Sequence, residues 1–411
     1  MRILLVTLFY EPLNNIAVTR LKAFNKYLTE FGHEVDVLTR HYSEDDILSS
    51  NLNKGMLAGD DFEGDYYKKG NVIYTKYKTT NSKLNFSNKL PKGIKGLYNI
   101  SQLDVFHYSF VEYGVKAYQQ EFSNNPHDII IASSPVPAAL LLAKQINEQF
   151  GVKWIADFRD SYFTDEDNIS IRFFKRQVLN DTLKRSSGIL YTSKWMLEDD
   201  LKLLSKAISK LPKEIIYNGF SKAENSHEED IINSVGLLMS NKKLIVFTGT
   251  LYIQRNLNFF LDSALSINDK EVVFVFVGIQ KVFKDEIIEK YSNLNIHFFD
   301  NVSYATSLKL QKMANFLLMP IWRGKFTGFP GKVFEYIQSD TKIIVDKEPP
   351  LELKSFLIKY KNFNCCYDKG DVFDKYIDSN VVNYKLTTLE KELISRKYQV
   401  KKLNIFLEKL I

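Results

Sequence analysis

Residues 327–336 read Thr-Gly-Phe-Pro-Gly-Lys-Val-Phe-Glu-Tyr, and a strand-like run follows at residues 341–345. Gly328, Pro330 and Gly331 predict a loop that cannot be helical, after which a helix begins with its unpaired backbone N–H groups facing that loop. Such a helix start attracts anions, and glycines let a phosphate approach the backbone closely. The stretch therefore predicts either a phosphate site between a loop and a helix or a well-capped amphipathic helix with no ligand.

Two charged side chains in this helix start point to the kind of ligand. Lys332 would add a full positive charge beside a phosphate. Glu335 lies one turn into the helix and would repel a phosphate, so its natural partner is a pair of hydroxyls such as those of a ribose. Together they indicate a nucleotide. In the competing interpretation, Val333, Phe334 and Ile337 form the buried face of a purely structural helix.

Around this stretch, apolar runs of strand length alternate with helical patterns. We expect strands at residues 2–8, 35–38, 71–77, 128–132, 153–157, 188–191, 214–217, 244–248, 272–277, 295–299, 316–319 and 342–345. We expect helices at residues 16–31, 102–122, 136–150, 171–184, 193–204, 256–267, 283–291 and 303–313. Strands that are apolar throughout and separated by helices indicate parallel sheets covered on both faces, so the fold class is α/β.

The chain has 411 residues, which is too long for one ordinary core. The alternation breaks at residues 218–242, where polar residues and an acidic run at 228–230 interrupt it. We therefore expect two doubly wound, Rossmann-like domains, 1–218 and 219–384, facing a central cleft. Residues 385–411 carry leucines at helical spacing and would form a helix of about 35 to 40 Å. This helix either crosses back to the first domain or forms a coiled-coil seam between two copies.

Composition limits the function classes. Hydrophobic residues make up 45% and charged residues 25% of the chain, as in soluble globular proteins. No apolar run approaches the ~20 residues of a membrane-spanning helix. The N-terminal residues 1–10 lack a small-residue cleavage site, so we expect a first strand and not a signal peptide. Cys365 and Cys366 are adjacent, which fits a reducing cytoplasm. The net charge of +6 does not demand nucleic acid.

Residues 66–103 contain no acidic residue but many lysines. The lysines of this basic segment are Lys68, Lys69, Lys76, Lys78, Lys83, Lys89, Lys92 and Lys95. Apolar residues lie between them, so the segment either lies on an anionic membrane surface or forms a solvated basic loop. No recognised nucleic-acid module accompanies it, which makes nucleic acid a poor partner.

Six short motifs carry a family resemblance. They are Phe9-Tyr10-Glu11-Pro12 with Thr19-Arg20, Gly32-His33-Glu34-Val35, Asp157-Phe158-Arg159-Asp160, Asn218-Gly219-Phe220, Phe247-Thr248-Gly249-Thr250-Leu251-Tyr252 with Arg255, and Pro330-Gly331-Lys332-Val333-Phe334-Glu335-Tyr336. In this order the whole chain resembles a bacterial glycosyltransferase of the GT-B fold, in the retaining family 4, in the branch that assembles surface polysaccharides. The resemblance implies sugar transfer from a nucleotide-sugar bound mostly by the second domain to an acceptor held by the first. It also implies that the last helix crosses back to the first domain.

The resemblance also implies a donor site. Gly249 and Thr250 would lie against the donor diphosphate, while Arg255 and Lys332 would stabilise the departing nucleotide and so take part in catalysis. The remaining donor-binding positions are Asn301 and Val302 near the base, the loop residues Phe329, Pro330 and Gly331, and Glu335 at the ribose. A cation at a helix start, such as Arg255, is electrostatically unfavourable unless an anion binds beside it. In the competing interpretation, Arg255 is an exposed first-turn residue without a ligand.

The acceptor side is less determined. Positions expected there are Asn15, Arg20, Ser133, Ser134 and Arg159, and the two carboxylates Asp157 and Asp160 are catalytic candidates. These carboxylates either assist the acceptor hydroxyl or form an Asp–Arg pair that only fixes the loop. The chain departs from many relatives in two places. Thr327 stands where they have a second glutamate, and Ser133-Ser134-Pro135 stands where they have a histidine.

The resemblance implies a hexosyl- or N-acetylhexosaminyltransferase that uses a nucleotide sugar, with UDP favoured, and no metal or other cofactor. The acceptor would be a saccharide or a lipid-linked saccharide in capsule, O-antigen or similar synthesis, in the cytoplasm or on the inner face of the plasma membrane. Two alternatives stay open: a non-hydrolysing sugar-nucleotide epimerase of the same fold, and a non-catalytic partner subunit. The sequence argues against a dinucleotide-dependent dehydrogenase, since Asn14-Asn15-Ile16-Ala17 stands where the glycine-rich turn would follow the first strand.

Overall fold

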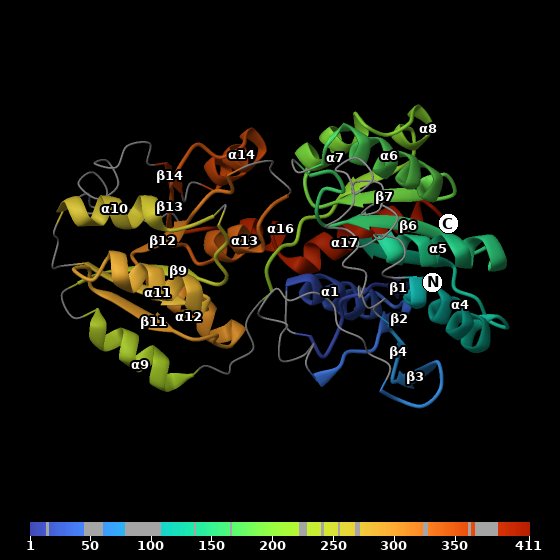
Figure 1. Ribbon diagram of the computed structural model, residues 1–411, viewed down its shortest axis with the longest axis horizontal. Helices are drawn as coiled ribbons and strands as arrows, with labels where there is room; N and C mark the ends of the chain where they lie inside the picture. The colour runs from blue at the N-terminus through green and yellow to red at the C-terminus, as the bar shows by residue number, and fades with distance from the viewer. Residues whose placement is uncertain are drawn as a thin grey trace, which may run out of the picture. The chain divides into compact units, whose positions relative to one another are not determined.

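The computed structural model describes residues 1–13, 16–44, 61–78, 108–134, 137–164, 167–221, 228–239, 242–253, 255–267, 272–323, 328–360, 363–365 and 385–411. They form two compact units, one made of Met1–Asn218 with Arg396–Ile411 and the other of Gly219–Ser395. Each unit has its own sheet with helices against it (Figure 1). The division after Asn218 coincides with the expected domain junction, whereas the tail divides at Ser395 and not at Lys385.

Unit 1 is built on an eight-stranded sheet. Its strands are β1 (Arg2–Val6), β2 (Glu34–Arg40), β3 (Tyr66–Lys69), β4 (Val72–Thr75), β5 (Ile129–Ser134), β6 (Lys153–Phe158), β7 (Gly188–Tyr191) and β8 (Lys213–Ile215), in the order β3-β4-β2-β1-β5-β6-β7-β8. All neighbours pair in parallel except β3, which forms an antiparallel hairpin with β4. The chain first builds outward from β1 to β4 and then returns to add β5 on the other side. The winding therefore reverses between β1 and β5.

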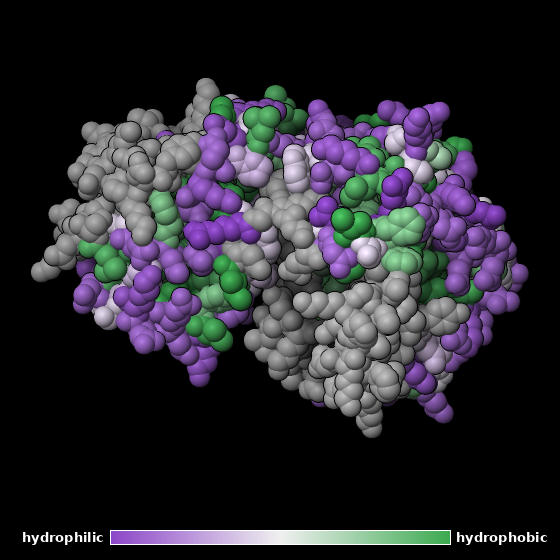
Figure 2. All heavy atoms as spheres, turned by 45° about the horizontal axis from the view of Figure 1, so that its top comes forward, coloured by the Kyte–Doolittle hydropathy of each residue, from purple (hydrophilic) through white to green (hydrophobic). Residues whose placement is uncertain are grey.

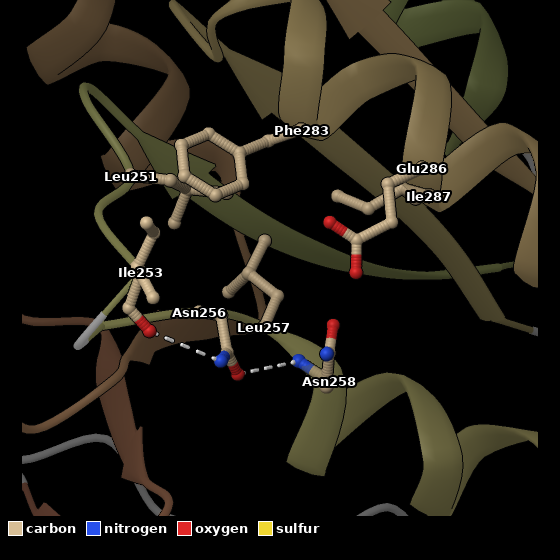
Figure 3. Close-up of a pocket in the computed structure, with 8 residues that line it drawn as sticks. All are labelled: Leu251, Ile253, Asn256, Leu257, Asn258, Phe283, Glu286 and Ile287. Carbon is tan, nitrogen blue, oxygen red and sulfur yellow. Dashed lines mark hydrogen bonds between the residues drawn. The ribbon is translucent and has the colours of Figure 1, made fainter. Parts of the chain in front are cut away.

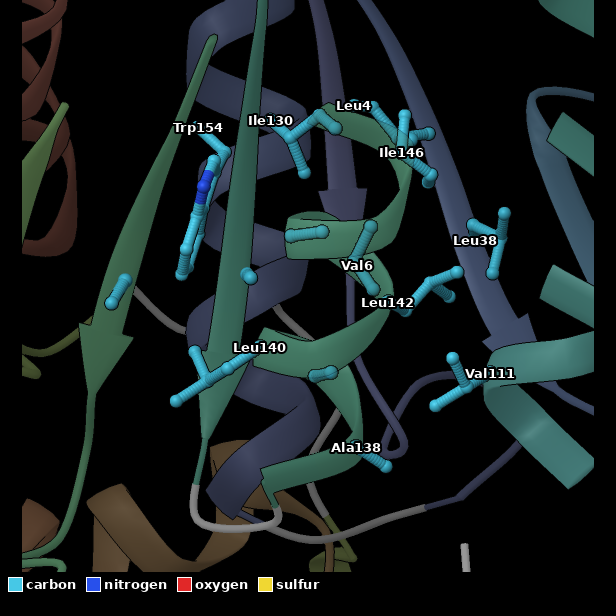
Figure 4. Close-up of a cluster of buried hydrophobic side chains, with 14 of the residues drawn as sticks. Leu4, Val6, Leu38, Val111, Ile130, Ala138, Leu140, Leu142, Ile146 and Trp154 are labelled. Atoms are coloured by element: carbon cyan, nitrogen blue, oxygen red, sulfur yellow. The ribbon is translucent and has the colours of Figure 1, made fainter. Parts of the chain in front are cut away.

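Alternate residues of the unit 1 strands enter two different hydrophobic cores. The helices of this unit are α1 (Ile16–Glu30), α4 (Tyr108–Phe122), α5 (Pro137–Phe150), α6 (Ile169–Leu183), α7 (Lys194–Leu201), α8 (Lys206–Ser209) and α17 (Arg396–Glu408). Leu4 and Val6 pack with Ile130 and Trp154 beneath α4 and α5 (Figure 4). Residues of opposite parity, such as Leu5, pack beneath α1 and α17. This period of two is what a sheet covered on both faces requires.

Unit 2 has a six-stranded, wholly parallel sheet. Its strands are β9 (Lys243–Thr248), β10 (Val272–Val277), β11 (Ile296–Phe299), β12 (Phe316–Met319), β13 (Lys342–Val345) and β14 (Phe363–Cys365), in the order β11-β10-β9-β12-β13-β14. Its helices are α9 (Glu229–Leu238), α10 (Asn258–Ile267), α11 (Lys281–Lys290), α12 (Tyr304–Met313), α13 (Gly331–Gln338), α14 (Leu351–Lys359) and α16 (Thr388–Leu393). One core lies between the sheet and the helices α10 and α11. The winding reverses between β9 and β12, where ligands of such sheets bind.

The C-terminal segment differs from the single long helix that the sequence predicts. Helix α16 ends at Leu393, and α17 begins at Arg396 after a break. The break has a physical cause, because the N–H of Phe220 donates a hydrogen bond to the carbonyl of Ile394, 3.2 Å away, and Phe220 forms a β-bridge with Ser395. Helix α17 packs on the unit 1 core through Val400 and other apolar residues, which leaves no apolar seam for a coiled coil.

Five other elements were not expected: β3, α8, α9, α14 and β14. Helix α9 lies inside the segment interpreted as a linker, because its acidic run looked like a solvated break. The carboxylates of Glu229 and Asp230 instead occupy the first turn of the helix, where the helix dipole favours negative charge. Glu228 accepts hydrogen bonds from the backbone N–H and the hydroxyl of Ser303 at the start of α12. The acidic run is thus a helix start, and the linker is shorter than expected.

No helix among the described ranges is both long and apolar enough to span a bilayer.

Candidate functional site

The carboxyl ends of β9, β10 and β11 form the edge of unit 2 where a ligand is expected. β9 ends at Thr248, and the next residue, Gly249, has a φ of 100°, which favours glycine. The N–H of Gly249 donates to the carbonyl of Val277 at 2.7 Å, and the N–H of Gly278 donates to that of Phe299 at 3.0 Å. Gly249 and Gly278, the first residues after β9 and β10, are therefore each hydrogen-bonded to the last residue of the next strand along the sheet edge.

Helix α13 begins beside the end of β9 and is fixed there by a hydrogen bond. The hydroxyl of Tyr336 accepts the N–H of Thr248 at 3.2 Å. The hydroxyl of Thr248 accepts from the side-chain amide of Gln311 on α12 at 3.0 Å. The helix start has Pro330 at its cap position, without a side-chain cap. Its first N–H groups are therefore not capped by the Pro330 side chain.

Lys332 occupies the space beside Gly249. Its Nζ lies 4.1 Å from the centroid of the Phe247 ring. A Cβ at Gly249 would come within 2.6 Å of Lys332 Cε and 2.8 Å of Nζ, so a larger residue there would displace the end of the lysine side chain. The Nζ atom is buried and makes no hydrogen bond with any described residue. Burial, reinforced by the charge of Arg255 and partly offset by Glu335, lowers the pKa of Lys332 to about 7.

Arg255 lies in the loop that follows β9. Backbone hydrogen bonds in both directions join it to Tyr252, at 2.9 and 3.2 Å, and close a turn. Its guanidinium carbon lies 5.5 Å from the centroid of the Trp322 ring, and its Nε is buried without a hydrogen bond to the described part of the chain. Burial lowers the pKa of the guanidinium, while Asp346 acts in the opposite direction. Two half-buried cations thus lie at this edge, where Arg255 lowers the pKa of Lys332, and they could hold an anion.

The other predicted donor residues lie around the same edge. Glu335 is half-buried one turn after Lys332 and is near enough to raise the pKa of Lys332. Asn301 is exposed, and its Oδ1 would lie 2.8 Å from a Cβ at Gly278. Thr250 and Val302 are half-buried after β9 and β11. These positions lie around one edge of unit 2, and their role in donor binding stays a prediction.

Phe329 differs from its neighbours in the predicted loop. Its side chain is buried, with its ring 5.2 Å from that of Phe356 on α14 and 6.0 Å from that of Phe334. Only the backbone of Phe329 is therefore left for a ligand. Thr327, at which the chain departs from its relatives, lies outside the described residues.

A small cavity of about 130 Å³ lies beside the loop after β9 (Figure 3). It is lined by Leu251, Ile253, Asn256, Leu257, Asn258, Phe283, Glu286 and Ile287, from the loop after β9 and the helices α10 and α11. Asn256 receives a hydrogen bond from the N–H of Asn258 at 3.2 Å, which fixes the start of α10. None of the predicted donor residues lines the cavity. We interpret it as a packing gap beneath the loop that carries Arg255.

In unit 1, Arg20 and Asp157 form a buried, bidentate ion pair at the carboxyl edge of the sheet. Arg20 Nη2 donates to Asp157 Oδ1 at 2.7 Å and Nε donates to Oδ2 at 3.1 Å. Asp157 Oδ2 also accepts the hydroxyl of Ser133 at 2.9 Å, and Arg20 Nη1 donates to the carbonyl of Ile216 at 2.8 Å. Both carboxylate oxygens of the fully buried Asp157 are engaged. Asp157 therefore orients Arg20 and is poorly placed to accept a proton from a substrate.

Arg159 and Asp160 follow β6 on the same edge. Arg159 Nε donates to the carbonyl of Ser134 at 2.5 Å, and its guanidinium carbon lies 5.5 Å from the centroid of the Phe9 ring. Burial lowers the pKa of Arg159, while the carboxylates of Asp160 and Asp157 act in the opposite direction. The Asp160 side chain is exposed. The expected Asp–Arg pairing is thus made by Arg20 and Asp157, not by Arg159. Asn15 lies outside the described residues.

Some residues that shape these edges were not predicted from the sequence. Gln280 accepts the N–H of Leu251 at 3.0 Å and donates to its carbonyl at 2.9 Å, which clamps the loop after β9. Asp346, directly after β13, accepts the N–H of Ile321 at 2.7 Å, and burial raises its pKa. The sequence could have pointed to Asp346, because a carboxylate directly after an apolar strand lies at the edge where ligands bind. The single amide Gln280 gave no such signal.

The basic segment is described only in part. Lys68 forms an ion pair with Glu121 at 3.6 Å, and Lys76 lies 5.6 Å from the centroid of the Phe62 ring. Lys83, Lys89, Lys92 and Lys95 lie outside the described residues. Elsewhere, exposed hydrophobic side chains occur in small separate patches on the face seen in Figure 2. Scattered patches of this size are normal on soluble proteins. Contact with a membrane therefore stays a prediction.

Among the residues that the structure describes, no group of three or more histidine, cysteine, aspartate or glutamate side chains could hold a metal ion. The expectation that the protein needs no metal stays a prediction.

Comparison with known proteins shows the fold. No protein-family model matches the sequence, and no curated protein matches it either. Sucrose-phosphate synthase from Thermosynechococcus elongatus superposes with a TM-score of 0.66 at 13% identity, over 100% of this chain and 98% of that one. Trehalose-6-phosphate synthase OtsA gives 0.60 at 10% identity, over 100% and 99%. Anabaena HepE in complex with UDP-glucose gives 0.59 at 11% identity, over 100% and 98%. These likenesses span both units, and they confirm that the chain has the GT-B fold, with two Rossmann-like units.

Proposed function

We propose that this protein is a glycosyltransferase that takes a sugar from a nucleotide-sugar donor, with UDP-sugars favoured. The observation that carries the proposal is the buried Nζ of Lys332, which has no hydrogen-bond partner among the described residues and lies beside Gly249 at the start of α13. A buried cation without an acceptor is costly unless a ligand supplies one. Glycine, helix start and cation together fit a diphosphate. That HepE was solved with UDP-glucose supports a nucleotide sugar as the donor.

In the proposed binding mode, the diphosphate lies between Gly249 and the start of α13. Lys332 and Arg255 contact its oxygens, and charge-assisted hydrogen bonds make such contacts strong. Glu335, one turn further along α13, accepts hydrogen bonds from the ribose hydroxyls. Asn301 and Val302, after β11, contact the base through backbone groups. Thr250 and the backbone of residues 329–331 complete the donor site.

In the reaction, an acceptor hydroxyl oxygen bonds to the anomeric carbon of the sugar while the bond from that carbon to the diphosphate oxygen breaks. Lys332 and Arg255 stabilise the negative charge that develops on the departing nucleotide. The hydroxyl proton goes to the departing diphosphate or to a carboxylate. We assign that carboxylate role to the exposed Asp160 and not to Asp157, whose oxygens are taken by Arg20 and Ser133. We further propose that the hydroxyl attacks from the same face that the diphosphate leaves, so that the anomeric configuration is retained.

For the pathway, we propose that the transferred residue is a hexose or N-acetylhexosamine added to a saccharide or lipid-linked saccharide of a surface polysaccharide. The proposal rests on the six motifs, which are typical of that branch of transferases. It places the protein in the cytoplasm, at the inner face of the plasma membrane when the acceptor is lipid-linked. The basic segment would then lie towards anionic lipid.

Calorimetry and thermal shifts with UDP, GDP, UDP-glucose and UDP-N-acetylglucosamine test the proposal. A ligand at 100 times its dissociation constant stabilises the folded protein by about 2.7 kcal/mol and names the donor class. Lys332→Met and Glu335→Ala should each weaken binding by about 10-fold or more. The matched control is Lys309→Met, at an exposed position on α12. Absence of any nucleotide effect on the wild type would overturn the proposal, and conversion of UDP-N-acetylglucosamine without an acceptor would assign the epimerase activity instead.

A further inference from the structure

Arg159 is a buried arginine whose two terminal nitrogens make no hydrogen bond with the part of the chain that the structure describes. The residue is only 8% exposed. Its Nε donates to the carbonyl of Ser134 at 2.5 Å, and its own carbonyl accepts the hydroxyl of Thr192 at 2.8 Å. Nη1 and Nη2 donate no hydrogen bond to any described residue. The Nε end of the guanidinium is therefore fixed, while Nη1 and Nη2 form a fork of donors that is available to a ligand.

The place of this fork in the fold favours an anion. Arg159 follows β6, and Ser134 is the last residue of β5, one of the two strands between which the winding of unit 1 reverses. Helix α5 begins at Pro137, so its first N–H groups face the same sheet edge. Arg159, held on Ser134 at the end of β5, and the start of the 14-residue helix α5 therefore lie at the same edge of the unit 1 sheet, where ligands of such sheets bind. Phe9, beneath the guanidinium, limits its movement.

Two carboxylates among the described residues, Asp160 and Asp157, act on the pKa of Arg159. The carboxylate oxygens of Asp157 already accept hydrogen bonds from Arg20 and Ser133. Asp160 is near enough to influence the pKa of Arg159, but it makes no ion pair with it within the described chain. A planar fork of free donors that is not matched by a carboxylate suits the two oxygens of a phosphate or carboxylate group.

We infer that Arg159, with the start of α5, binds an oxyanion carried by the acceptor, so that the acceptor is a sugar with a phosphate or carboxylate group. The inference rests on the proposed function only in naming the ligand as the acceptor. The anion fixes the acceptor at this edge of unit 1. Asp160, one residue further along the chain, then lies near enough to receive a hydroxyl of the same sugar.

The test is calorimetric titration of the full chain with glucose 6-phosphate, glucuronate and neutral glucose, and with inorganic phosphate as the simplest probe. All titrations are repeated in Lys332→Met, which removes the anion site of unit 2. The wild type should bind at least one charged sugar more tightly than glucose, and the preferred one separates phosphate from carboxylate. Arg159→Met should weaken that binding by about 10- to 100-fold. Arg159→Lys keeps the charge and should lose less. The control Arg176→Met, at an exposed position on α6, should lose nothing.

Three outcomes would overturn the inference: equal binding of charged and neutral sugars by the wild type, unchanged anion binding in Arg159→Met, or a parallel loss of UDP binding in Arg159→Met, which would assign the arginine to the donor. Because UDP binding is measured on the same samples, the two proposals fail separately. If UDP does not bind but the Arg159-dependent anion preference remains, the proposed function is wrong and the anion site stands. Unchanged UDP affinity in Arg159→Met also shows that unit 2 is folded.

Discussion

Lys332 Nζ lies 4.1 Å from the centroid of the ring of Phe247, which lies on β9 two residues before Gly249. The face of an aromatic ring attracts a cation, but it cannot replace the hydrogen bonds that an ammonium group makes in water. Burial therefore favours the neutral amine, and the pKa of Lys332 falls to about 7. The proposed diphosphate would favour the ammonium form instead, so that nucleotide binding is coupled to the uptake of a proton.

The binding of UDP-glucose should take up a proton at mildly alkaline pH. At about pH 8 most Lys332 side chains are neutral in the free protein, whereas the bound diphosphate favours the ammonium form. Affinity should fall as the pH rises from about 7 to about 9, by at most 10-fold per pH unit for one proton. Calorimetry in buffers with different ionisation enthalpies counts the proton. In Lys332→Met, both the uptake and the pH dependence should vanish; pH-independent binding by the wild type would contradict the assignment.

Without a ligand, the same lysine should destabilise the protein at neutral pH. Between about pH 7 and about pH 10.4, Lys332 is mostly neutral in the folded protein but protonated in the unfolded chain. The unfolded state therefore binds more protons than the folded state in this pH range. The free energy of unfolding should therefore rise with pH through that window. Lys332→Met should be more stable than the wild type near pH 7, by a few kcal/mol at most. Urea denaturation at several pH values measures this, and equal slopes against pH in the two proteins would refute it.

Gly249→Ala should impair nucleotide binding more than it impairs folding. The new methyl group would lie 2.6 Å from Lys332 Cε and would displace the lysine from the strand end. Gly249 also has a φ of 100°, so alanine adds backbone strain of about 1 to 2 kcal/mol. The control is Gly32→Ala, because Gly32 has a φ of 89° but nothing within 4 Å of a Cβ. Both variants should lose similar stability, but only Gly249→Ala should lose affinity for UDP-glucose. Similar affinities would contradict the proposed site.

The alternation of apolar runs and helical patterns was sufficient to predict most of this fold. Continuous apolar strands such as Val272–Val277 can only be buried on both faces, which indicates a parallel sheet. Elements without such a pattern were missed. Tyr66–Lys69 has two exposed lysines and is held as a strand by its hairpin with β4. The break between α16 and α17 depends on a hydrogen bond from Phe220, far away in sequence, which no local pattern reveals.

For the candidate site, sequence reasoning named residue types and strand ends but not partners. It placed Lys332 and Gly249 at one ligand, and the structure brings them together. In unit 1 it paired the carboxylates with Arg159, whereas Asp157 pairs with Arg20, 137 positions away in the chain. Which arginine reaches a carboxylate depends on the depth of each side chain in the fold. That depth is a tertiary property, so the pairing of Asp157 with Arg20 could not be predicted from the sequence.

Breaking the Arg20–Asp157 pair should cost unit 1 much of its stability. The side chains are 3% and 0% exposed, and removal of one partner leaves a buried charge without compensation. Arg20→Met or Asp157→Asn should each destabilise by about 3 to 5 kcal/mol in urea denaturation. The Arg20→Met/Asp157→Asn double variant should lose less than the sum of the two single losses.

The control for this pair is the exposed ion pair of Lys397 with Glu30, whose nitrogen and oxygen lie 2.9 Å apart. Lys397→Met should cost at most about 1 kcal/mol. A different result for Asp157→Asn would reassign that residue. If the variant keeps its stability but loses glycosyl transfer, Asp157 acts in the chemistry and the orienting role given to it here is wrong.

The C-terminal helix should stabilise unit 1 and not unit 2. Leu403 on α17 is fully buried in the same core as Leu5 and Leu21, so Leu403→Ala removes contacts with β1 and α1. Such truncations cost about 2 to 5 kcal/mol. Leu389→Ala on α16 is the matched control, because Leu389 is 64% exposed and its loss should stay within about 0.5 kcal/mol. Hydrogen exchange separates the units: Leu403→Ala should speed exchange in β1 and β5 while exchange in β9 and β10 stays unchanged. Faster exchange in β9 and β10 would show that α17 supports both units, which its packing within unit 1 does not predict.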